Sequence, residues 1–422
     1  MTAFLVYGMY AGAKRAFPYK QLRSFPPLVE AVKLLTSARE DPWYYSNRRV
    51  QDPVQIHDSD GMMSGLTLVS TLTGEEDFWI KVIAPTGEVV TDWRFDIFSI
   101  WPDFSHLDER DIPKKRPGSH VHGVLPLEDG GIVFVVERIG LVRMNACGQV
   151  QWRLPHRAHH SIFMDDLGDY WTGGWIARRD MQGLPKNHKP VVDEMRIYRV
   201  SARGELIDDI SIFDIFDKNG LGGLLNLSTL DNRDATVTGD TLHLNDVEVF
   251  PDNLQPGVFQ PGDVMISLRN INGVFVFDSD TWELRAHTIG KVLRQHDPDF
   301  IDGNRVAIFD NNTSDDPRFE QASRIAIWDA RDGSVVTEWQ GSSEQPFYTA
   351  IMGKQQRLEN GNLLLVEAAN GRVIEVGTDG RIVWEWNNVV AENTVAIIDD
   401  AQRLPIQFDA ALYKARRQDC EG

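Results

Sequence analysis

The feature that most constrains the fold is a segment that recurs six times between about residues 64 and 390. Each copy has an apolar run, a turn that usually contains Gly with Asp, Thr or Arg, and a second run that often ends in tryptophan. The copies are WIKVIAPTGEVVTDW, GLVRMNACGQVQW, RIYRVSARGELIDDI, GVFVFDSDTWELRAH, RIAIWDARDGSVVTEW and GRVIEVGTDGRIVWEW. Short apolar runs that flank such turns are typical of β-hairpins.

A second pair of strand-like runs precedes the hairpin in most copies, which favours a four-stranded sheet. Sheets of this size that repeat around an axis form a β-propeller, and a propeller exposes only short sheet edges. Helical periodicity is nearly absent, so an alternating β/α architecture fits poorly. We predict an all-β fold, a six-bladed β-propeller of four-stranded antiparallel blades over residues 61–410. An insertion is expected near 216–240 and a polar tail at 411–422.

Residues 1–60 form a predicted N-terminal extension of different texture. Its first apolar run has about a dozen residues, too few to span a bilayer, and it lacks the basic start of a secretory signal. Basic residues follow the run, so the remnant of a membrane anchor, and hence membrane association, is one interpretation. The segment PPLVEAVKLLTSARE predicts one short amphipathic helix.

The charge balance limits the partners. The formal net charge is −19, with 43 basic and 62 acidic residues. Nucleic-acid binding needs a basic surface, so we expect no nucleic-acid partner. A small anionic substrate is still compatible with this net charge, because charges beyond about 10 Å are screened and the substrate responds mainly to those close to its site. The two cysteines, Cys147 and Cys420, are too few for a disulfide framework or a metal-binding pattern, and whether they pair is left open.

The histidines recur at one phase of the repeat. His122, His160, His243 and His296 each stand where a first strand of a repeat begins, and Gln356 has the comparable place in the last copy. The first strands of propeller blades line the central channel, so these side chains should converge. Convergent imidazoles can bind a metal ion or act as nucleophile, acid or base. Both chemistries remain open at this point.

Arg269 lies in VMISLRNINGVFVF, one strand after His243, and its planar guanidinium could hold an oxyanion. In RQHDPDF we expect His296 to point into the channel. Strand alternation would turn Asp297 away from it, and Asp299 would share the His296 side only if the alternation survives Pro298.

Four segments together resemble the arylsulfotransferase family, the bacterial aryl-sulfate sulfotransferases that use no nucleotide donor. The resemblance covers about residues 115–390 and is most specific in the second half. The segments are LHLNDVEV, GDVMISLRNINGVFVFD, RQHDPDFIDGNRVAIFDNN and QQRLENGNLLLVEAANGRVIEVGTDGRIVWEW. Members of that family are six-bladed propellers.

The resemblance implies a ping-pong transfer of a sulfuryl group from an aryl sulfate to a phenol, through a sulfohistidine on His296. It assigns His243, Arg269 and the pair His159 and His160 to holding the sulfuryl oxygens and protonating the leaving phenolate. His122, Asn245 and Gln356 are the expected substrate-binding residues. Phenolate is a good leaving group, so no cofactor and no metal ion are expected. A periplasmic or exported, membrane-anchored protein and a homo-oligomer are further expectations.

Three positions depart from the family pattern. Ser161 stands where Asp usually follows the histidine pair, Asp246 where a small residue is more typical, and Asn312 ends the turn motif. Two alternatives to sulfuryl transfer also stay open. One is a metal-dependent propeller hydrolase or lyase that uses the same histidines, and the other is a non-catalytic interaction platform.

Overall fold

The computed structural model describes residues 43–46, 52–109, 111–229, 236–314 and 322–420. The chain divides into two compact units, residues 1–45 and 46–422. The predicted helix over PPLVEAVKLLTSARE and the N-terminal apolar run lie outside the described residues. None of the described helices is long and apolar enough to cross a membrane.

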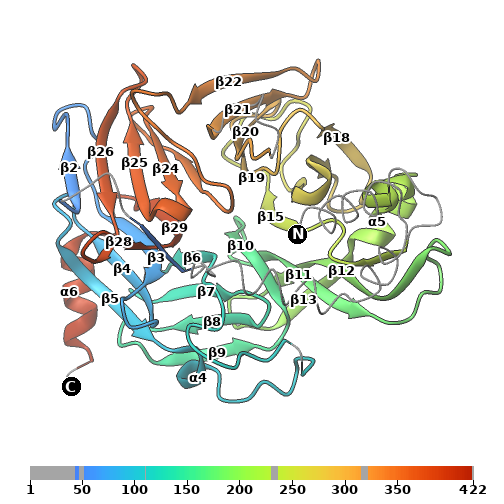
Figure 1. The fold of residues 1–422 in the computed structure, drawn as a ribbon, viewed down its shortest axis with the longest axis horizontal. Helices are drawn as coiled ribbons and strands as arrows, with labels where there is room; N and C mark the ends of the chain where they lie inside the picture. Colours follow the sequence, from blue (N-terminus) through green and yellow to red (C-terminus); the bar gives the residue numbers. More distant parts are fainter. Residues whose placement is uncertain (1–42, 47–51, 110, 230–235, 315–321, 421–422) are drawn as a thin grey trace, which may run out of the picture. The chain divides into compact units, whose positions relative to one another are not determined.

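Six sheets of the second unit each contain a four-stranded antiparallel path, counted over the described residues (Figure 1). The first two sheets, in path order, are β29 (Ile398–Arg403), β3 (Thr67–Leu72), β4 (Phe78–Ile83), β5 (Val89–Phe95), and then β6 (Gly123–Pro126), β7 (Ile132–Val136), β8 (Gly140–Met144), β9 (Val150–Leu154). The next two are β10 (Ala158–Met164), β11 (Tyr170–Arg178), β12 (His188–Val200), β13 (Leu206–Ser211), and then β15 (Leu244–Val249), β16 (Val264–Leu268), β17 (Gly273–Phe277), β18 (Leu284–Ile289). The last two are β19 (His296–Phe300), β20 (Arg305–Asp310), β21 (Arg324–Asp329), β22 (Val335–Gln340), and then β23 (Gln355–Arg357), β24 (Leu363–Glu367), β25 (Arg372–Val376), β26 (Ile382–Asn387). The predicted all-β class with four-stranded antiparallel sheets is confirmed, and every repeat forms the last hairpin of one sheet.

Short strands complete the described part of the fold. β2 (Val54–Ile56) extends the edge at β26, β14 (Val237–Gly239) pairs in parallel with β12, and β27 (Val389–Ala391) pairs with β28 (Thr394–Ala396). β1 covers Tyr44–Ser46.

The first strands of the six sheets contact one another in chain order. β6 packs against β10, β10 against β15, β15 against β19, β23 against β29, and β29 against β6. β19 and β23 are joined where the peptide N–H of Gln355 donates to Asp297 at 2.6 Å. One of the sheets combines both ends of this unit, since β29 pairs with β3 (Figure 1).

The repeat tryptophans link neighbouring sheets. The indole N–H of Trp93 donates to the carbonyl of Asn145 at 3.0 Å, and that of Trp339 donates to Gly380 at 3.1 Å. Trp384 donates in the same way to Pro85 at 2.8 Å. Each acceptor lies in the last hairpin turn of the next sheet, so the residue that marks the repeat also fixes how adjacent sheets meet. Apolar side chains of adjacent sheets form the core between them.

The segment near 216–240, predicted as an insertion, contains elements of its own. α5 (Ile212–Lys218) begins at the Ser211 cap and buries four apolar side chains, η1 (Gly222–Thr229) follows, and β14 comes after residues 230–235. The other short helices are α4 (Ile97–Ile100), η2 (Arg269–Ile271) and η3 (Ala368–Asn370).

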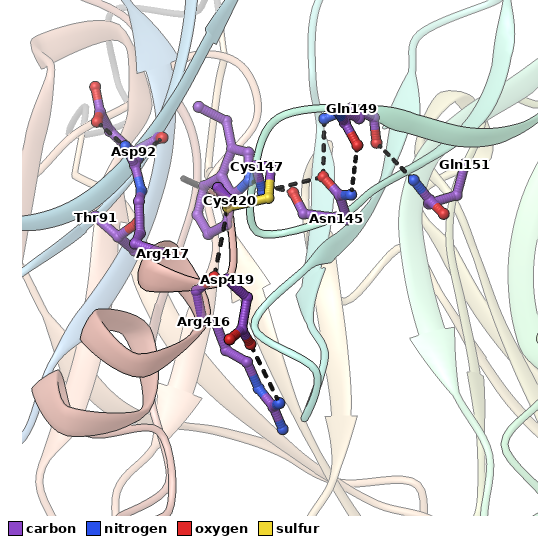
Figure 2. The surroundings of a disulfide bond; sticks show 11 residues. Thr91, Asp92, Asn145, Cys147, Gln149, Gln151, Arg416, Arg417, Asp419 and Cys420 are labelled. Atoms are coloured by element: carbon purple, nitrogen blue, oxygen red, sulfur yellow. Dashed lines mark hydrogen bonds and ion pairs between the residues drawn. A yellow bond between two sulfur atoms is a disulfide. The ribbon is translucent and has the colours of Figure 1, made fainter. Parts of the chain in front are cut away.

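Most of the predicted polar tail is helical. α6 (Ala410–Gln418) begins where the Asp409 carboxylate accepts from the N–H of Leu412, and it buries Tyr413. A disulfide joins Cys420 to Cys147, 273 residues earlier, with Cα atoms 5.6 Å apart (Figure 2). The pairing left open by the sequence is therefore present. It ties the end of α6 to the turn between β8 and β9.

Candidate functional site: a histidine cluster at a buried cavity

A small cavity lies where the first strands of the sheets meet. It is lined by His122, His160, Ser161, Asn245, His296, Asp297, Met352, Gly353, Lys354 and Asp399. These residues come from β10, β15, β19 and β29 and from the segments directly before β6 and β23. Strand starts far apart in the sequence therefore share one site.

Backbone bulges explain why so many polar side chains reach the cavity. The pairing register shifts in β10 between His159 and Ile162, in β15 between Leu244 and Asp246, in β19 between His296 and Pro298, and in β29 between Ile398 and Asp400. A bulge leaves a residue unpaired and re-aims its side chain. The residues inside these shifts are His160, Ser161, Asn245, Asp297 and Asp399, and all of them line the cavity.

This geometry corrects the expectation for Asp297. Strand alternation predicted that its side chain faces away from the channel, but the bulge in β19 turns it into the cavity beside His296. Its φ of 44° belongs to the left-handed region, as does the φ of 60° at His160. These strained positions occur at the site itself.

Six imidazoles form one connected cluster. His122 stacks on His160 with ring centroids 4.4 Å apart and planes 9° apart. The His160 ring also lies edge-to-face with its neighbours, 4.3 Å from His159, 5.1 Å from His243 and 5.9 Å from His296. His120 adds a ring 4.7 Å from His122. Gly123 permits the close approach of β6 to β10, because a Cβ there would lie 2.8 Å from the Ile162 nitrogen.

Hydrogen bonds fix which nitrogen of three imidazoles carries the hydrogen. Nδ1 of His159 lies 2.7 Å from the Leu244 carbonyl, and Nδ1 of His243 bonds the Asp240 carboxylate. Both partners only accept, so Nδ1 donates in each case. Nε2 of each of these rings is then left with its lone pair in the neutral form.

His296 is held in the same way by Asn311. Its Nδ1 lies 2.7 Å from Oδ1 of Asn311, whose amide nitrogen donates to the carbonyls of Thr349 and Met352 at 2.9 and 2.7 Å. Two carbonyl acceptors leave one orientation for the amide, so Oδ1 faces His296 and Nδ1 donates. Nε2 of His296 is buried and has no hydrogen-bond partner among the described residues.

Two carboxylates besides Asp240 contact the cluster. Glu137, just after β7, accepts the peptide N–H of His160 at 2.9 Å and lies 3.2 Å from Nε2 of His159 and 3.3 Å from Nδ1 of His122. Burial favours its neutral form, but His159 and His122 lower the pKa of this carboxyl well below its usual range. Asp399 bonds Nδ1 of His120 at 2.9 Å.

Burial keeps the imidazoles of His159, His160, His243 and His296 neutral. It lowers the pKa of His159 to about 3, against the attraction of Glu137. Burial together with neighbouring histidines holds the pKa of His160 well below its usual value. Burial also lowers the pKa of His243, and it lowers that of His296 strongly despite the bond to Asn311. The cluster therefore offers lone pairs and N–H dipoles.

A group of carboxylates lies near Asp297 and Lys354, two residues that line the cavity. Asp297 bonds Lys354 and accepts from the peptide N–H of Gln355. Burial raises the pKa of Asp246 to about 7, opposed by Lys354, and raises that of Asp400 to about 6. It also raises the pKa of Glu248 and of Asp299 well above the usual values.

Four of the predicted site residues, Arg269, Gln356, His159 and His243, are not among those that line the cavity. The rings of His159 and His243 contact the ring of His160, which does line it. The peptide N–H of Arg269 donates to the His243 carbonyl at 3.0 Å, and burial, with Arg294 nearby, lowers the pKa of its guanidinium to about 10. The Gln356 amide bonds the backbone of Arg403 on both sides, at 2.7 and 3.1 Å, so it joins β23 to β29.

Sequence reasoning missed Glu137, Asp240, Lys354 and Asp399. For Glu137 and Asp399 the sequence contained an indication of a buried role. Glu137 breaks the apolar run GIVFVVERIG at its end, and Asp399 belongs to an acidic pair inside AIIDDAQ. Charges within an apolar strand are costly to bury unless they are partnered. Asp240 and Lys354 lie in loops, where sequence periodicity gives no direction.

Three groups of side chains have ligand atoms close enough to hold one metal ion, within 4.8 Å of one another in each group. They are His159, His160 and His243; His120, His122 and Asp399; and His122, Glu137 and His160.

The fold and the site define a β protein with a cluster of neutral histidines at a buried cavity, suited to nucleophilic or ligand chemistry at imidazole. Residues 123–389 match the model of the arylsulfotransferase (ASST) family, which is more than half of the chain. The chain belongs to this family, and the resemblance stated from its motifs is confirmed. The family activity is sulfuryl transfer, with aryl sulfate and phenol as substrates.

The search of the curated proteins finds no match. Among solved structures, a protein of unknown function from Bacteroides caccae is 12% identical, with a TM-score of 0.47 over 80% of this chain and 98% of that one. The WD40 β-propeller domain of Doa1 is 9% identical, with a TM-score of 0.41 over 87% and 99%. Virginiamycin B lyase from Staphylococcus aureus is 12% identical, with a TM-score of 0.37 over 69% and 86%.

Proposed function

We propose that this protein transfers a sulfuryl group from an aryl sulfate to a phenol in two steps, through a covalent intermediate on Nε2 of His296. The observation that supports this most directly is the environment of that nitrogen. Asn311 holds the hydrogen on Nδ1, and Nε2 is buried without a partner among the described residues, in a ring that lines the cavity. A neutral imidazole with a free lone pair is the form that attacks an electrophile.

In the first step the Nε2 lone pair attacks sulfur, the N–S bond forms, and the S–O bond to the aryl group breaks. The electron pair of that bond leaves on the aryl oxygen, and the phenolate departs as the anion. The sequence-based expectation that His159 or His160 protonates it is dropped, because both imidazoles are neutral. In the second step the oxygen of an acceptor phenol attacks the same sulfur. The N–S bond breaks, the electron pair returns to Nε2, and the phenol proton passes to a base of the cluster.

The charge that spreads over the sulfuryl oxygens needs fixed donors in a dry site. We assign this role to Arg269 and His160, supported by His243. Arg269 supplies the full positive charge, and His160 supplies an N–H dipole. The hydrogen of His243 stays on Nδ1 against Asp240, so this ring acts through its Nε2, which lies 3.0 Å from Nε2 of His160 and orients that imidazole. His122 and Asn245 are the proposed substrate-binding residues; Gln356 loses this role here, since its amide is committed to Arg403.

We also infer that the six sheets are the blades of one six-bladed propeller. The contacts of the first strands in chain order and the sheet that joins β29 to β3 support this arrangement. Export to the periplasm or beyond is a further proposal. The disulfide between Cys147 and Cys420 supports it, because such bonds persist in oxidising compartments. Membrane attachment through residues 1–60 and homo-oligomer formation remain predictions.

The test uses p-nitrophenyl sulfate with the purified protein. Without an acceptor, we expect one equivalent of nitrophenolate and a mass increase of one sulfuryl group on the peptide that contains His296. Adding a phenol should discharge the adduct and start turnover. His296→Ala should abolish both, while His188→Gln, a buried histidine outside the cavity, should retain both. Turnover by His296→Ala at the wild-type rate would refute the proposal.

A non-catalytic interaction platform gives no reason for buried histidines to converge on a cavity. The observed clustering therefore favours the enzymatic function. The metal-based alternative has separate support, because the ligand atoms of His159, His160 and His243 lie within 4.8 Å of one another.

A further inference from the structure

The cluster of His159, His160 and His243 has three features of a metal site. The first is the spacing of its nitrogens. Nε2 of His160 and Nε2 of His243 lie 3.0 Å apart, and the ligand atoms of all three histidines lie within 4.8 Å of one another. Two nitrogens that bind zinc tetrahedrally at about 2.0–2.1 Å are separated by roughly 3.3 Å. One pair is therefore close to the required spacing already, and the nitrogen of the third ring lies within 4.8 Å of both.

The second feature is the partners of the outer nitrogens. Metal-binding imidazoles usually donate their other N–H to a carboxylate or a backbone carbonyl, which orients the ring toward the metal. His243 bonds the Asp240 carboxylate through Nδ1, and His159 bonds the Leu244 carbonyl through Nδ1 at 2.7 Å. Both rings thus have the supporting bond that a ligand histidine needs.

The third feature is a contact between two acceptors. Because Nδ1 of His159 donates to a carbonyl, Nε2 faces Oε1 of Glu137 at 3.2 Å with its lone pair. That nitrogen has no hydrogen bond among the described residues and is fully buried, the side chain being 0% exposed. Two acceptors at this distance require a cation between them. A proton or a metal ion satisfies the requirement, and the further nitrogens of His160 and His243 favour a metal ion.

We propose that His159, His160 and His243 bind one divalent transition-metal ion of the zinc class beside Glu137. Three imidazole nitrogens suit Zn²⁺ or Co²⁺, whereas Mg²⁺ and Ca²⁺ prefer oxygen ligands. This inference stands on the geometry of the ligand atoms and holds whether or not the chain transfers sulfuryl groups.

One consequence rests on the proposed function. His160 is assigned to the sulfuryl oxygens, so a metal ion bound to its imidazole would compete with the sulfuryl group for that ring. Zn²⁺ would then act as a reversible inhibitor, with its effect reversed by a chelator.

The experiment titrates Co²⁺ into chelator-treated protein that has no histidine tag. We expect one equivalent to bind, with the visible d–d absorption of a tetrahedral nitrogen-rich site, and Zn²⁺ to displace it. His243→Gln should weaken binding by at least about 100-fold, and Asp240→Asn by about 10- to 100-fold, the range for losing a supporting bond. The matched control is His188→Gln, which should bind Co²⁺ as the wild type does.

Circular dichroism of each variant separates loss of the site from loss of the fold. If His243→Gln does not fold, the wild-type Co²⁺ spectrum and Asp240→Asn decide the question. No stoichiometric Co²⁺ binding by the wild type, or binding that His243→Gln and Asp240→Asn leave unchanged, would overturn the inference. Turnover of p-nitrophenyl sulfate in excess chelator reports on the proposed function separately, because it needs no metal ion.

Discussion

Replacing Asn311 by alanine removes the acceptor that orients the proposed nucleophile. Asn311 is 0% exposed, and its side chain makes three hydrogen bonds, to His296 at 2.7 Å, to the Thr349 carbonyl at 2.9 Å and to the Met352 carbonyl at 2.7 Å. When Nε2 attacks sulfur, the ring becomes cationic, and the bond from Nδ1–H to Oδ1 becomes a bond to a charged group. Such bonds contribute about 1.5–3 kcal/mol.

This stabilisation acts on the transition state, so its loss should appear in the rate. A loss of about 1.5–3 kcal/mol corresponds to a decrease in kcat/KM of roughly 10- to 150-fold. The assay measures the initial rate of nitrophenolate release from p-nitrophenyl sulfate with a phenol as acceptor. His296→Ala should lose all activity, whereas Asn311→Ala should retain a measurable fraction and still form some covalent adduct.

Asn388 provides the matched control. It is also buried, 2% exposed, and its amide makes three hydrogen bonds, donating to Thr71 at 2.7 Å and to the Leu72 carbonyl at 3.1 Å and accepting from Lys81 at 3.3 Å. Asn388→Ala and Asn311→Ala should lose similar unfolding free energy, about 1.5–4.5 kcal/mol for three bonds. Only Asn311→Ala should lower kcat/KM of the folded protein. Wild-type kcat/KM in Asn311→Ala, or an equal loss in both variants, would refute the reasoning.

The remaining predictions concern pH and the disulfide. Because the pKa of His296 lies well below its usual 6.5, the imidazole stays unprotonated in mild acid. We therefore expect kcat/KM for nitrophenolate release to stay nearly constant from pH 7.5 to 5.5 in a pH–rate profile. A histidine with an unshifted pKa would lower kcat/KM about 10-fold over that range. Burial raises the folded-state pKa of Asp246 from 3.8 to about 7, so ionisation opposes folding as pH rises through that interval. Asp246→Asn should therefore gain stability over the wild type between pH 4 and 7, by up to about 1.4 kcal/mol per pH unit in urea unfolding, and a difference that does not change with pH would contradict this. Cys147→Ser should lower the unfolding free energy by about 2–4 kcal/mol under non-reducing conditions and match the reduced wild type, whereas equal midpoints for variant and oxidised wild type would show that the bond adds nothing.

The repeat predicted much of the fold because its signal is local. Alternating apolar residues and Gly-containing turns specify hairpins within each copy, and all six hairpins form in the structure. The terminal tryptophans were visible as a pattern, but their role was not. Trp93 and Trp339 bond turns in neighbouring sheets, and those partners depend on how the sheets pack.

The recurrence of histidine at one position of the repeat predicted which side chains meet, but it could not predict the bulges in the strands. His122, His160 and His296 line one cavity because they occupy equivalent strand starts. Asp297 was expected to face away, since sequence gives strand alternation but does not reveal a bulge. A bulge depends on pairing with the neighbouring strand, so its register becomes known only when both strands are placed.

The sequence by itself determined the hairpin units, their number and the recurrence of histidine at one position, because these follow from short-range patterns of side chains. The tertiary structure decided what those histidines can do. Bulges in four first strands turn their side chains into the cavity, Glu137 and Asn311 reach the rings from other segments, and burial removes the charge from the imidazoles. Hydrogen-bond partners, protonation and the disulfide from Cys147 to Cys420 all depend on distances between segments far apart in the chain, and such distances exist only in the folded protein.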